Sequence, residues 1–421
     1  MIQFKDYPFK GKRVLLRVDF NVPFDKTDTL ITDDSRIRRA IPTIQHIVNA
    51  GGRVVLLSHR GRPKGKVVES LSLQRVLRTL EALVGKHVEF APDCIGEEAL
   101  AKTKSLKDGD ILLMENVRFH AEDEGKVKQK EGEAEADFAE RKKAMKAAQK
   151  AFAQQLALNG DCYVNDAFSA AHRAHASTTF VAESFPQDRM FGPLMLAELD
   201  ALERMLNQPT KPILAIMGGA KVSDKILLID RLLDRVDRII IGGGMTYTFV
   251  KAMGGQIGNS LCEDDRLDVA KELIAKAKQK GVELLLPTDA VNADKFAADA
   301  KTNTTSVDAT PDGYMGLDIG PESVKRFSEA ILQSKSILWN GPMGVFEMEP
   351  FAKGTFAIAE ALAQATKNGA YTLVGGGDSV SALKSSGNEE HVSYVSTGGG
   401  AMLEYLEGKV LPGIGVIQDH K

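Results

Sequence analysis

The stretch Pro212–Leu228, PILAIMGGAKVSDKILL, predicts a strand, a tight turn and the start of a helix in immediate succession. Ile213–Met217 is an apolar run with the length of a buried strand, and it is too short for a helix. Gly218 and Gly219 allow the backbone to turn sharply and to approach a ligand closely. Ser223–Leu228 then resumes at helical spacing.

Two lysines make this junction a candidate anion site. Lys221 and Lys225 are four residues apart, which places them on one face of the expected helix. Backbone N–H groups and the positive end of a helix dipole favour a phosphate at the same place. An ordinary strand-to-helix junction with two solvated lysines is the alternative, and the junction alone does not decide between them.

Further strands alternate with helical segments on both sides of this stretch. In the first half the expected strands are Lys12–Val18, Arg53–Leu57, Val88–Phe90, Ile111–Met114 and Cys162–Val164. In the second half they are Ile213–Met217, Arg238–Ile241, Val282–Leu286, Ser336–Trp339 and Tyr371–Val374. Alternation of this kind predicts an α/β fold with two Rossmann-like domains, each a parallel sheet flanked by helices.

The expected helices and the chain length suggest how the halves are divided. The helices include Arg38–Asn49, one capped by Ser70, a solvated one over Ala134–Leu158, and Pro193–Leu206. A chain of 421 residues favours two domains. We expect the first over residues 1–188 and the second over 189–402, with Pro193–Leu206 as a hinge helix between them.

Composition narrows the class of protein. The formal net charge of −3 excludes a global attraction to nucleic acid or to a membrane surface. Three cysteines spread far apart favour a reducing compartment over a disulfide framework. The N-terminal segment lacks an apolar signal region, and no run approaches the roughly 18 apolar residues of a membrane span. A cytoplasmic enzyme is expected.

Basic side chains follow the strands of the first half. The cationic and polar candidates on these loops are Arg17, Asn21, Arg36, His59, Arg62, Arg118 and Arg173. Ligands of parallel sheets bind at the carboxyl ends of the strands, and arginine matches carboxylates and phosphates with two parallel hydrogen bonds. Any one arginine could instead pair with a surface acid. As a group, with Asp19 beside them, they indicate a small, hydroxylated, multiply anionic acid.

Glycine-rich loops follow the strands of the second half and indicate a nucleotide. Gly375–Gly377 and Ser396–Gly400 suit phosphate oxygens through backbone N–H groups, although glycines also serve close packing. Asp378 suits Mg²⁺, with a simple helix N-cap as the alternative. Glu347 suits ribose hydroxyls, with an exposed acid as the alternative. His172 and His175 are not expected to bind a metal, since no carboxylate or thiolate lies near them in sequence.

Several common fingerprints are missing. No GxGxxG follows a strand, which disfavours a dehydrogenase, and GK[ST] never occurs, which excludes a Walker A loop. The protein kinase motifs HRDxxxxN and DFG are also absent. A non-catalytic, nucleotide-responsive binding protein stays open as the alternative to an enzyme.

A set of longer motifs, in order along almost the whole chain, is more specific. They are RVDFNVP at Arg17–Pro23, SHRGRP at Ser58–Pro63, ENVRF at Glu115–Phe119, NDAF at Asn165–Phe168, AHRAHAS at Ala171–Ser177, GGAKVSDK at Gly218–Lys225, WNGPMGVFE at Trp339–Glu347, GGGDS at Gly375–Ser379 and STGGGA at Ser396–Ala401. Together they resemble the phosphoglycerate kinase family. The resemblance implies reversible phosphoryl transfer between 1,3-bisphosphoglycerate and ADP, giving 3-phosphoglycerate and ATP, in glycolysis and gluconeogenesis.

The resemblance also implies site residues, a metal and a C-terminal tail, 403–421, that returns to the first domain. For phosphoglycerate it implies Asp19, Phe20, Asn21, Arg36, His59, Arg60, Gly61, Arg62, Arg118 and Arg173. For the nucleotide it implies Gly218, Lys221, Lys225, Gly316, Glu347, Gly376, Gly377, Asp378 and Ser379, with Mg²⁺ on Asp378. The implied catalytic residues are Arg36, Lys221, Gly399 and Gly400. A cytoplasmic monomer with small-molecule substrates is expected.

The chain departs from the family pattern in three places. Arg60 stands where an apolar residue is common, Ser169-Ala170 replaces a frequent Gly-Thr, and residues 121–150 are longer and more charged than expected. The proposed chemistry needs no general base, because a carboxylate acceptor with a pKa of about 3.5–4 is already ionised at neutral pH. Catalysis then depends on alignment and on preorganised positive charge.

Overall fold

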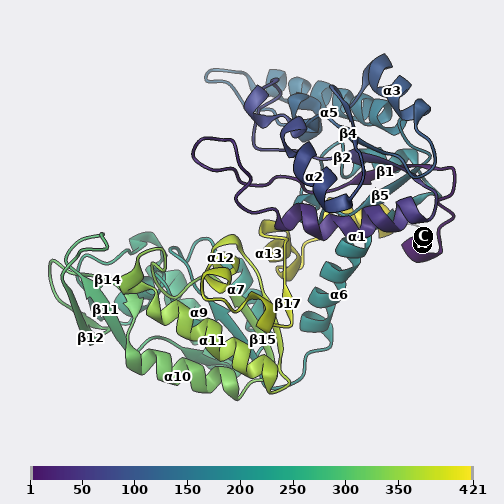
Figure 1. Cartoon of the computed structure of the whole chain (residues 1–421). Coiled ribbons are helices and arrows are strands. Elements are labelled where there is room, and N and C mark those ends of the chain that lie inside the picture. Colours follow the sequence, from purple (N-terminus) through teal and green to yellow (C-terminus); the bar gives the residue numbers. More distant parts are fainter. Residues whose placement is uncertain (1–2, 419–421) are drawn as a thin grey trace. The chain divides into compact units, whose positions relative to one another are not determined.

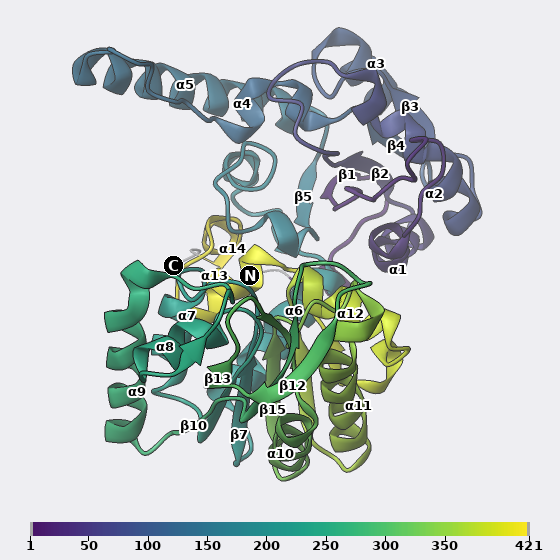
Figure 2. The same ribbon diagram turned by 90° about the vertical axis from the view of Figure 1, so that its left-hand side faces the viewer.

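The computed structural model describes residues 3–418, so the terminal residues 1–2 and 419–421 of the predicted first domain lie outside the described part. The described chain divides into two units. One contains the residues up to Leu199 together with those from Val410 on, and the other is Asp200–Lys409. Each unit is built on a six-stranded parallel sheet, as the alternating pattern predicts (Figures 1 and 2).

The sheet of the first unit has the strand order β3-β4-β2-β1-β5-β6. Its strands are β1 (Arg13–Arg17), β2 (Arg53–Leu57), β3 (Glu89–Ala91), β4 (Ile111–Met114), β5 (Cys162–Asn165) and β6 (Arg189–Phe191). Its helices are α1 (Ser35–Asn49), α2 (Leu77–Val84), α3 (Gly96–Ser105), α4 (Ala121–Glu124), α5 (Glu135–Ala157) and α14 (Pro412–Gln418). Strand β1 is fully buried from Val14 to Arg17 because it pairs on both sides, with β2 and β5.

The sheet of the second unit has the order β10-β8-β7-β15-β16-β17. Its strands are β7 (Ile213–Met217), β8 (Arg238–Ile241), β10 (Glu283–Leu285), β15 (Ser336–Asn340), β16 (Tyr371–Val374) and β17 (Tyr394–Val395). Its helices are α7 (Ile226–Leu232), α8 (Thr246–Ala252), α9 (Leu267–Lys280), α10 (Pro321–Leu332), α11 (Lys353–Lys367), α12 (Gly377–Ser385) and α13 (Gly400–Leu406), and α6 (Pro193–Asn207) enters it from the first unit.

Smaller elements were not expected from the sequence. The second unit carries an antiparallel sheet of β12 (Thr302–Ser306), β11 (Asp289–Ala293) and β14 (Met315–Ile319), and a two-stranded sheet of β9 (Gln256–Ile257) and β13 (Ala309–Thr310). These strands are short, and polar residues or glycine interrupt them, so they give no apolar run. Residues of β11 and β14 line the cavity described below.

Three local expectations are corrected by the structure. Arg189–Phe191 is the edge strand β6, paired with β5, so the chain leaves the first unit after 199 rather than after 188. Helix α13 contacts α7, which keeps residues up to Lys409 in the second unit, and the return to the first unit begins at Val410 instead of 403. Ser72, not Ser70, provides the cap near α2, by accepting a hydrogen bond from the N–H of Gln74.

Among the helices of residues 3–418, none combines the length and the apolar character needed to cross a lipid bilayer.

Candidate functional site

In the first unit the strand order reverses direction between β1 and β5, and the candidate acid site lies at the ends of these strands. The loop after β1 carries Asp19, whose carboxylate pairs with Nη1 of Arg36 at 2.6 Å. Ser169, on the loop after β5, donates its hydroxyl to the same carboxylate oxygen. The β1 loop, the β5 loop and the start of α1 therefore meet at one carboxylate.

These contacts stabilise the ionised form of the Asp19 carboxyl group. Burial alone would raise its pKa, but the positive charge of Arg36 and hydrogen bonds from Ser169 and the N–H of Asn21 hold it below its ordinary value. Asp19 is thus ionised at neutral pH. The guanidinium of Arg36, with 40% of its side chain exposed, is fixed in direction while still open to solvent.

His59 is oriented by a buried arginine. Arg17 Nη2 donates to His59 Nδ1 at 3.1 Å, and Arg17 Nε donates to Ser177 Oγ at 3.1 Å. Since arginine only donates, Nδ1 must accept, and the remaining ring proton sits on Nε2. Burial lowers the pKa of His59 well below its ordinary value, and the charge of Arg17 lowers it further, so the ring is neutral at pH 7.

A second set of contacts joins three loops. The N–H of Gly61 donates to Asn21 Oδ1 at 2.8 Å, and Nη1 of Arg118 donates to the carbonyl oxygen of Gly61 at 3.0 Å. The Nε of Arg118 is buried without a hydrogen-bond partner within the described structure. Arg62 is exposed next to Gly61 on the loop after β2, and Arg173 is exposed on the loop after β5. The structure thus links Asn21, Gly61 and Arg118 directly by hydrogen bonds.

Phe20 and Arg60, both expected at the acid site, have other roles here. The Phe20 side chain is fully buried, its N–H donates to Ser58 Oγ, and its carbonyl accepts from the N–H of Val22. The Arg60 guanidinium lies 3.7 Å from the centre of the Phe24 ring and pairs with Asp28 at 3.0 Å. Neither side chain is therefore placed to contact a ligand, because each packs within the unit. Arg60 anchors its loop.

In the second unit the strand order reverses between β7 and β15, and the ends of these strands lie against each other. The N–H of Gly218 donates to the carbonyl oxygen of Asn340 at 2.9 Å, and that of Gly219 to Pro342 at 3.2 Å. A Cβ on Gly218 would lie 2.1 Å from the carbonyl oxygen of Pro342. Only glycine permits this close approach of the two loops.

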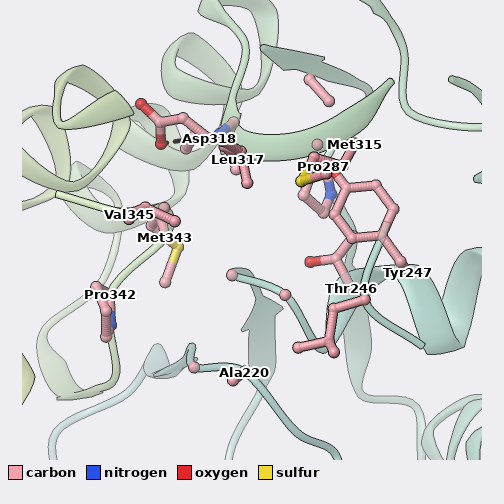
Figure 3. Close-up of a pocket in the computed structure, with 18 of the residues that line it drawn as sticks. Ala220, Thr246, Tyr247, Pro287, Met315, Leu317, Asp318, Pro342, Met343 and Val345 are labelled. Atoms are coloured by element: carbon pink, nitrogen blue, oxygen red, sulfur yellow. Dashed lines mark hydrogen bonds between the residues drawn. The ribbon is translucent and has the colours of Figure 1, made fainter. Parts of the chain in front are cut away.

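A cavity of about 720 Å³ opens beside these loops (Figure 3). Thr246 and Tyr247 lie across it from Pro342, Met343 and Val345. Gly316, Glu347 and Asp378, all predicted nucleotide residues, line it as well. The volume falls within the range of roughly 300–1,000 Å³ typical of small-molecule sites. At Gly316 a Cβ would lie 1.5 Å from the Tyr247 hydroxyl, so a side chain there would displace the tyrosine.

Lys221 and Lys225 do not share a helix face. Helix α7 begins only at Ile226, because Ser223 is bound to Glu263 through its N–H (3.0 Å) and its hydroxyl (2.5 Å), which keeps residues 222–225 in a turn. Lys221 is exposed. Lys225 reaches Asn340 Oδ1, and burial lowers the pKa of its ammonium. The two lysines expected on one helix face therefore lie in different surroundings: Lys221 faces solvent, and Lys225 contacts Asn340 at the end of β15.

The loop after β16 presents the predicted metal ligand. Asp378 lies in the first turn of α12 with an exposed side chain, and the N-cap position is taken by Gly376, which excludes the simple cap role for Asp378. One solvent-facing carboxylate fits Mg²⁺, which keeps most of its waters in protein sites. Gly377 is exposed beside it, whereas the Ser379 hydroxyl is buried and accepts from the N–H of Gly341 at 2.5 Å.

The loop before α13 contains the two predicted catalytic glycines. Gly399 has φ +49° and occupies the N-cap position, and Gly400 is the first residue of the helix. The N–H of Gly398 donates to Ser396 Oγ at 3.0 Å. This N–H is therefore used within the loop, and any anion contact there falls to Gly399 and Gly400.

Two residues of the cavity wall were missed from the sequence. Thr246 is 2% exposed, and its hydroxyl has no hydrogen-bond partner among the described residues. Asp318 is buried, and its carboxylate accepts the N–H groups of Gly354 (2.8 Å) and Ile319 (2.9 Å). Thr246 comes two residues after the glycine run Gly242–Gly244 that follows β8, which is the signal that could have found it. Asp318 lies within β14 and belongs to no glycine-rich or basic motif, so only the fold brings it to the site.

The buried carboxyl of Asp318 predicts that stability falls as pH rises. Burial raises its pKa from 3.8 to about 7, although the two N–H groups oppose this. The folded state therefore binds the proton more tightly than the unfolded chain does. The protonated Asp318 therefore contributes to the free energy of unfolding. The contribution is fully present below about pH 4 and is lost as the pH rises through about 7, and the total loss is roughly 4 kcal/mol at most.

Urea unfolding across this range tests the expectation. The Asp318→Asn variant should show a smaller drop in midpoint between about pH 4 and about pH 8 than the parent protein. The Asp312→Asn variant, at an exposed acid of the same unit, should show the same drop in urea midpoint as the parent protein. An equal drop in all three proteins would rule out Asp318 as the source of the pH dependence.

Comparisons with known proteins give a consistent picture. The family described as Phosphoglycerate kinase matches residues 4–409. A phosphoglycerate kinase of Porphyromonas gingivalis is 53% identical over 416 residues, covering 98% of this chain and 99% of that protein. One of Rippkaea orientalis is 52% identical, covering 97% and 96%.

Solved structures agree with these sequence comparisons. Phosphoglycerate kinase from Coxiella burnetii is 40% identical, with a TM-score of 0.84 over 99% of this chain and 98% of that one. The enzyme from Pyrococcus horikoshii is 30% identical, with a TM-score of 0.80 over the same shares.

Proposed function

Because the chain belongs to the phosphoglycerate kinase family, we propose that its two sites hold the two substrates of that reaction, one on each unit. Family membership makes the chain a kinase that transfers a phosphoryl group to and from a carboxyl acceptor in glycolysis. One observation supports assigning one substrate to each unit. The loops at the point where the strand order reverses carry cationic side chains in the first unit and are rich in glycine in the second.

In this proposal the first unit binds 3-phosphoglycerate. Arg36, Arg62, Arg118 and Arg173 supply positive charge for its phosphate and carboxylate. The ionised carboxylate of Asp19 accepts a hydrogen bond from its hydroxyl, and Asn21 donates one through Nδ2, because Asn21 Oδ1 is taken by the N–H of Gly61. The neutral ring of His59 donates from Nε2, since Arg17 occupies Nδ1.

The second unit binds the nucleotide in the cavity beside β7 and β15. The largely apolar wall around Tyr247 and Met343 suits the base, and exposed Glu347 suits the ribose. The loops at Gly218 and Gly376–Gly377, with Lys225, suit the phosphates. Mg²⁺ held by Asp378 would neutralise phosphate charge when it is bound.

The transfer step needs alignment more than proton chemistry. The carboxylate acceptor and the ADP oxygen are both anionic at neutral pH, so neither requires a general base. We propose direct in-line transfer, with Lys221, Arg36 and the N–H groups of Gly399 and Gly400 stabilising the charge on the moving phosphoryl group. With one substrate on each unit, the units must close to align them and to exclude water.

A single assay tests the proposed reaction. Purified protein should release ADP from ATP with Mg²⁺ only when 3-phosphoglycerate is present. A nucleotide-responsive binding protein would bind both compounds without this release. Closure of the two units is tested by small-angle scattering, in which the protein should become more compact when both ligands are present. Size-exclusion chromatography tests the proposed monomeric state. The cytoplasmic location is likewise a proposal.

Replacing Arg62 by alanine tests which unit holds the acid. Arg62 is exposed on the loop after β2, so its loss should leave the fold intact. A hydrogen bond between charged groups contributes about 1.5–3 kcal/mol, so KM for 3-phosphoglycerate should rise about 10-fold or more while KM for ATP changes little. A dominant effect on ATP would assign the substrates to the opposite units.

A further inference from the structure

Three metal-ligating side chains, from the segment after β3 and the segment before α4, meet in the first unit, and no step proposed above uses them. Asp93 and Cys94 follow β3, and His120 precedes α4. A carboxylate oxygen, the thiol sulfur and an imidazole nitrogen all lie within 4.8 Å of one another. His120 Nε2 is 2.7 Å from Asp93 Oδ1.

We propose that Asp93, Cys94 and His120 form a binding site for a thiophilic divalent cation, for which zinc has the best chemical match. Sulfur, nitrogen and oxygen ligands are those zinc takes, whereas Mg²⁺ selects oxygen alone. Tetrahedral zinc, with bonds of about 2.0–2.3 Å, separates its ligand atoms by about 3.3–3.8 Å. The ligand atoms now lie between 2.7 Å and at most 4.8 Å apart, and the His120–Asp93 contact would open by about 0.6 Å.

The surroundings give the cluster a closed side and an open side. The Cys94 side chain is 1% exposed, so the sulfur faces the interior. The Asp93 and His120 side chains are 49% and 26% exposed, which leaves an entry path and room for water as the fourth ligand. Binding would replace the thiol proton of Cys94, which leaves to solvent, and would use neutral His120.

Neighbouring groups orient the three ligands. The His120 ring packs against Phe152 with ring centres 4.9 Å apart. Asn159 Nδ2 donates to the carbonyl oxygen of Cys94 at 3.2 Å, and Asp93 Oδ1 accepts the N–H of Cys94 at 2.6 Å. Supporting contacts of this kind fix the direction of first ligands in metal sites. Two further carboxylates, those of Glu122 and Asp123, lie within three residues of His120 in the chain, and their negative charge favours a cation here.

An occupied site would tie the loop after β3 to the segment that carries Arg118, two residues before His120. Such a tie should raise the melting temperature of the full chain when metal is added, because the ion binds the folded state and not the unfolded one. This consequence does not depend on which substrate the first unit binds.

Cobalt titration of the full-length, tag-free protein without nucleotide tests the site. Co²⁺ should give the near-ultraviolet charge-transfer band of a thiolate ligand together with visible bands of tetrahedral geometry, at one ion per chain, and Zn²⁺ should displace it. Cys94→Ser should abolish the charge-transfer band. His120→Gln should weaken Co²⁺ binding by about 10-fold or more. Cys262→Ser, at the partly exposed thiol beside Asp264, should change nothing.

The proposal is overturned by a charge-transfer band that survives in Cys94→Ser, by one that disappears in Cys262→Ser, or by no Co²⁺ band in the parent protein. Far-ultraviolet circular dichroism establishes that each variant is folded. Should Cys94→Ser unfold, His120→Gln decides alone: unchanged Co²⁺ affinity in that variant also overturns the site. Because all readouts are metal binding, failure of the phosphoryl-transfer assay leaves the result intact.

Discussion

Replacing Lys221 by alanine is expected to lower kcat about 100-fold or more while nucleotide affinity changes little. Lys221 is exposed at the end of the β7 loop, where it has not been drawn into the β7–β15 contact as Lys225 has. Its ammonium can therefore meet the phosphoryl group as that group moves. A contact that strengthens only in the transition state affects kcat and leaves binding of the ground state nearly unchanged.

The measurements are steady-state kinetics in both directions and nucleotide binding by calorimetry. Lys251→Ala is the matched control, because Lys251 is a surface lysine of the same unit that pairs with Asp264 at 2.7 Å. It should retain the parent kcat, since an exposed ion pair contributes little. If Lys221→Ala loses nucleotide affinity and rate in equal measure, the residue serves ground-state binding instead.

The parallel sheets could be predicted from the sequence because their strands are buried on both faces. Ile213–Met217 and Ile111–Met114 are uninterrupted apolar runs, and Arg238–Ile241 is apolar after its first residue; the structure confirms the limits of all three strands. The edge strand β6, at Arg189–Phe191, is only three residues long and follows a segment that contains proline. Its sequence is therefore similar to that of a linker between domains, and the predicted boundary falls just before it. Short edge strands carry too little pattern to be separated from loops.

Side-chain direction was the main feature of the site that the sequence could not supply. The order of residues placed Arg17, Phe20 and Arg60 beside the acid-site candidates, but consecutive side chains of a strand or its loop point to different faces. Arg17 turns inward to hold His59, and Arg60 lies over Phe24. The helix expected from Ser223 failed for a similar reason, since the contact of Ser223 with Glu263 joins residues far apart in the chain.

The second large effect is expected from Arg36, the proposed catalytic residue of the first unit. Arg36→Ala should lower kcat/KM for 3-phosphoglycerate about 100- to 1,000-fold, the range seen when one preorganised donor to a developing negative charge is removed. The ion pair of Arg36 with Asp19 at 2.6 Å fixes the guanidinium before the ligand arrives, so little of its interaction energy is lost to ordering.

Two companion variants separate charge from geometry at this position. Arg36→Lys keeps the positive charge but loses the planar fork, so it should recover only part of the loss. Arg38→Ala removes an arginine from the same helix, one that pairs with Asp34 and has 62% of its side chain exposed, and it should leave kcat/KM unchanged. If Arg36→Ala and Arg38→Ala behave alike, positive charge near α1 has only a general electrostatic effect. If Arg36→Lys matches the parent protein, the planar shape of the guanidinium plays no part, and the role assigned to Arg36 reduces to that of a point charge.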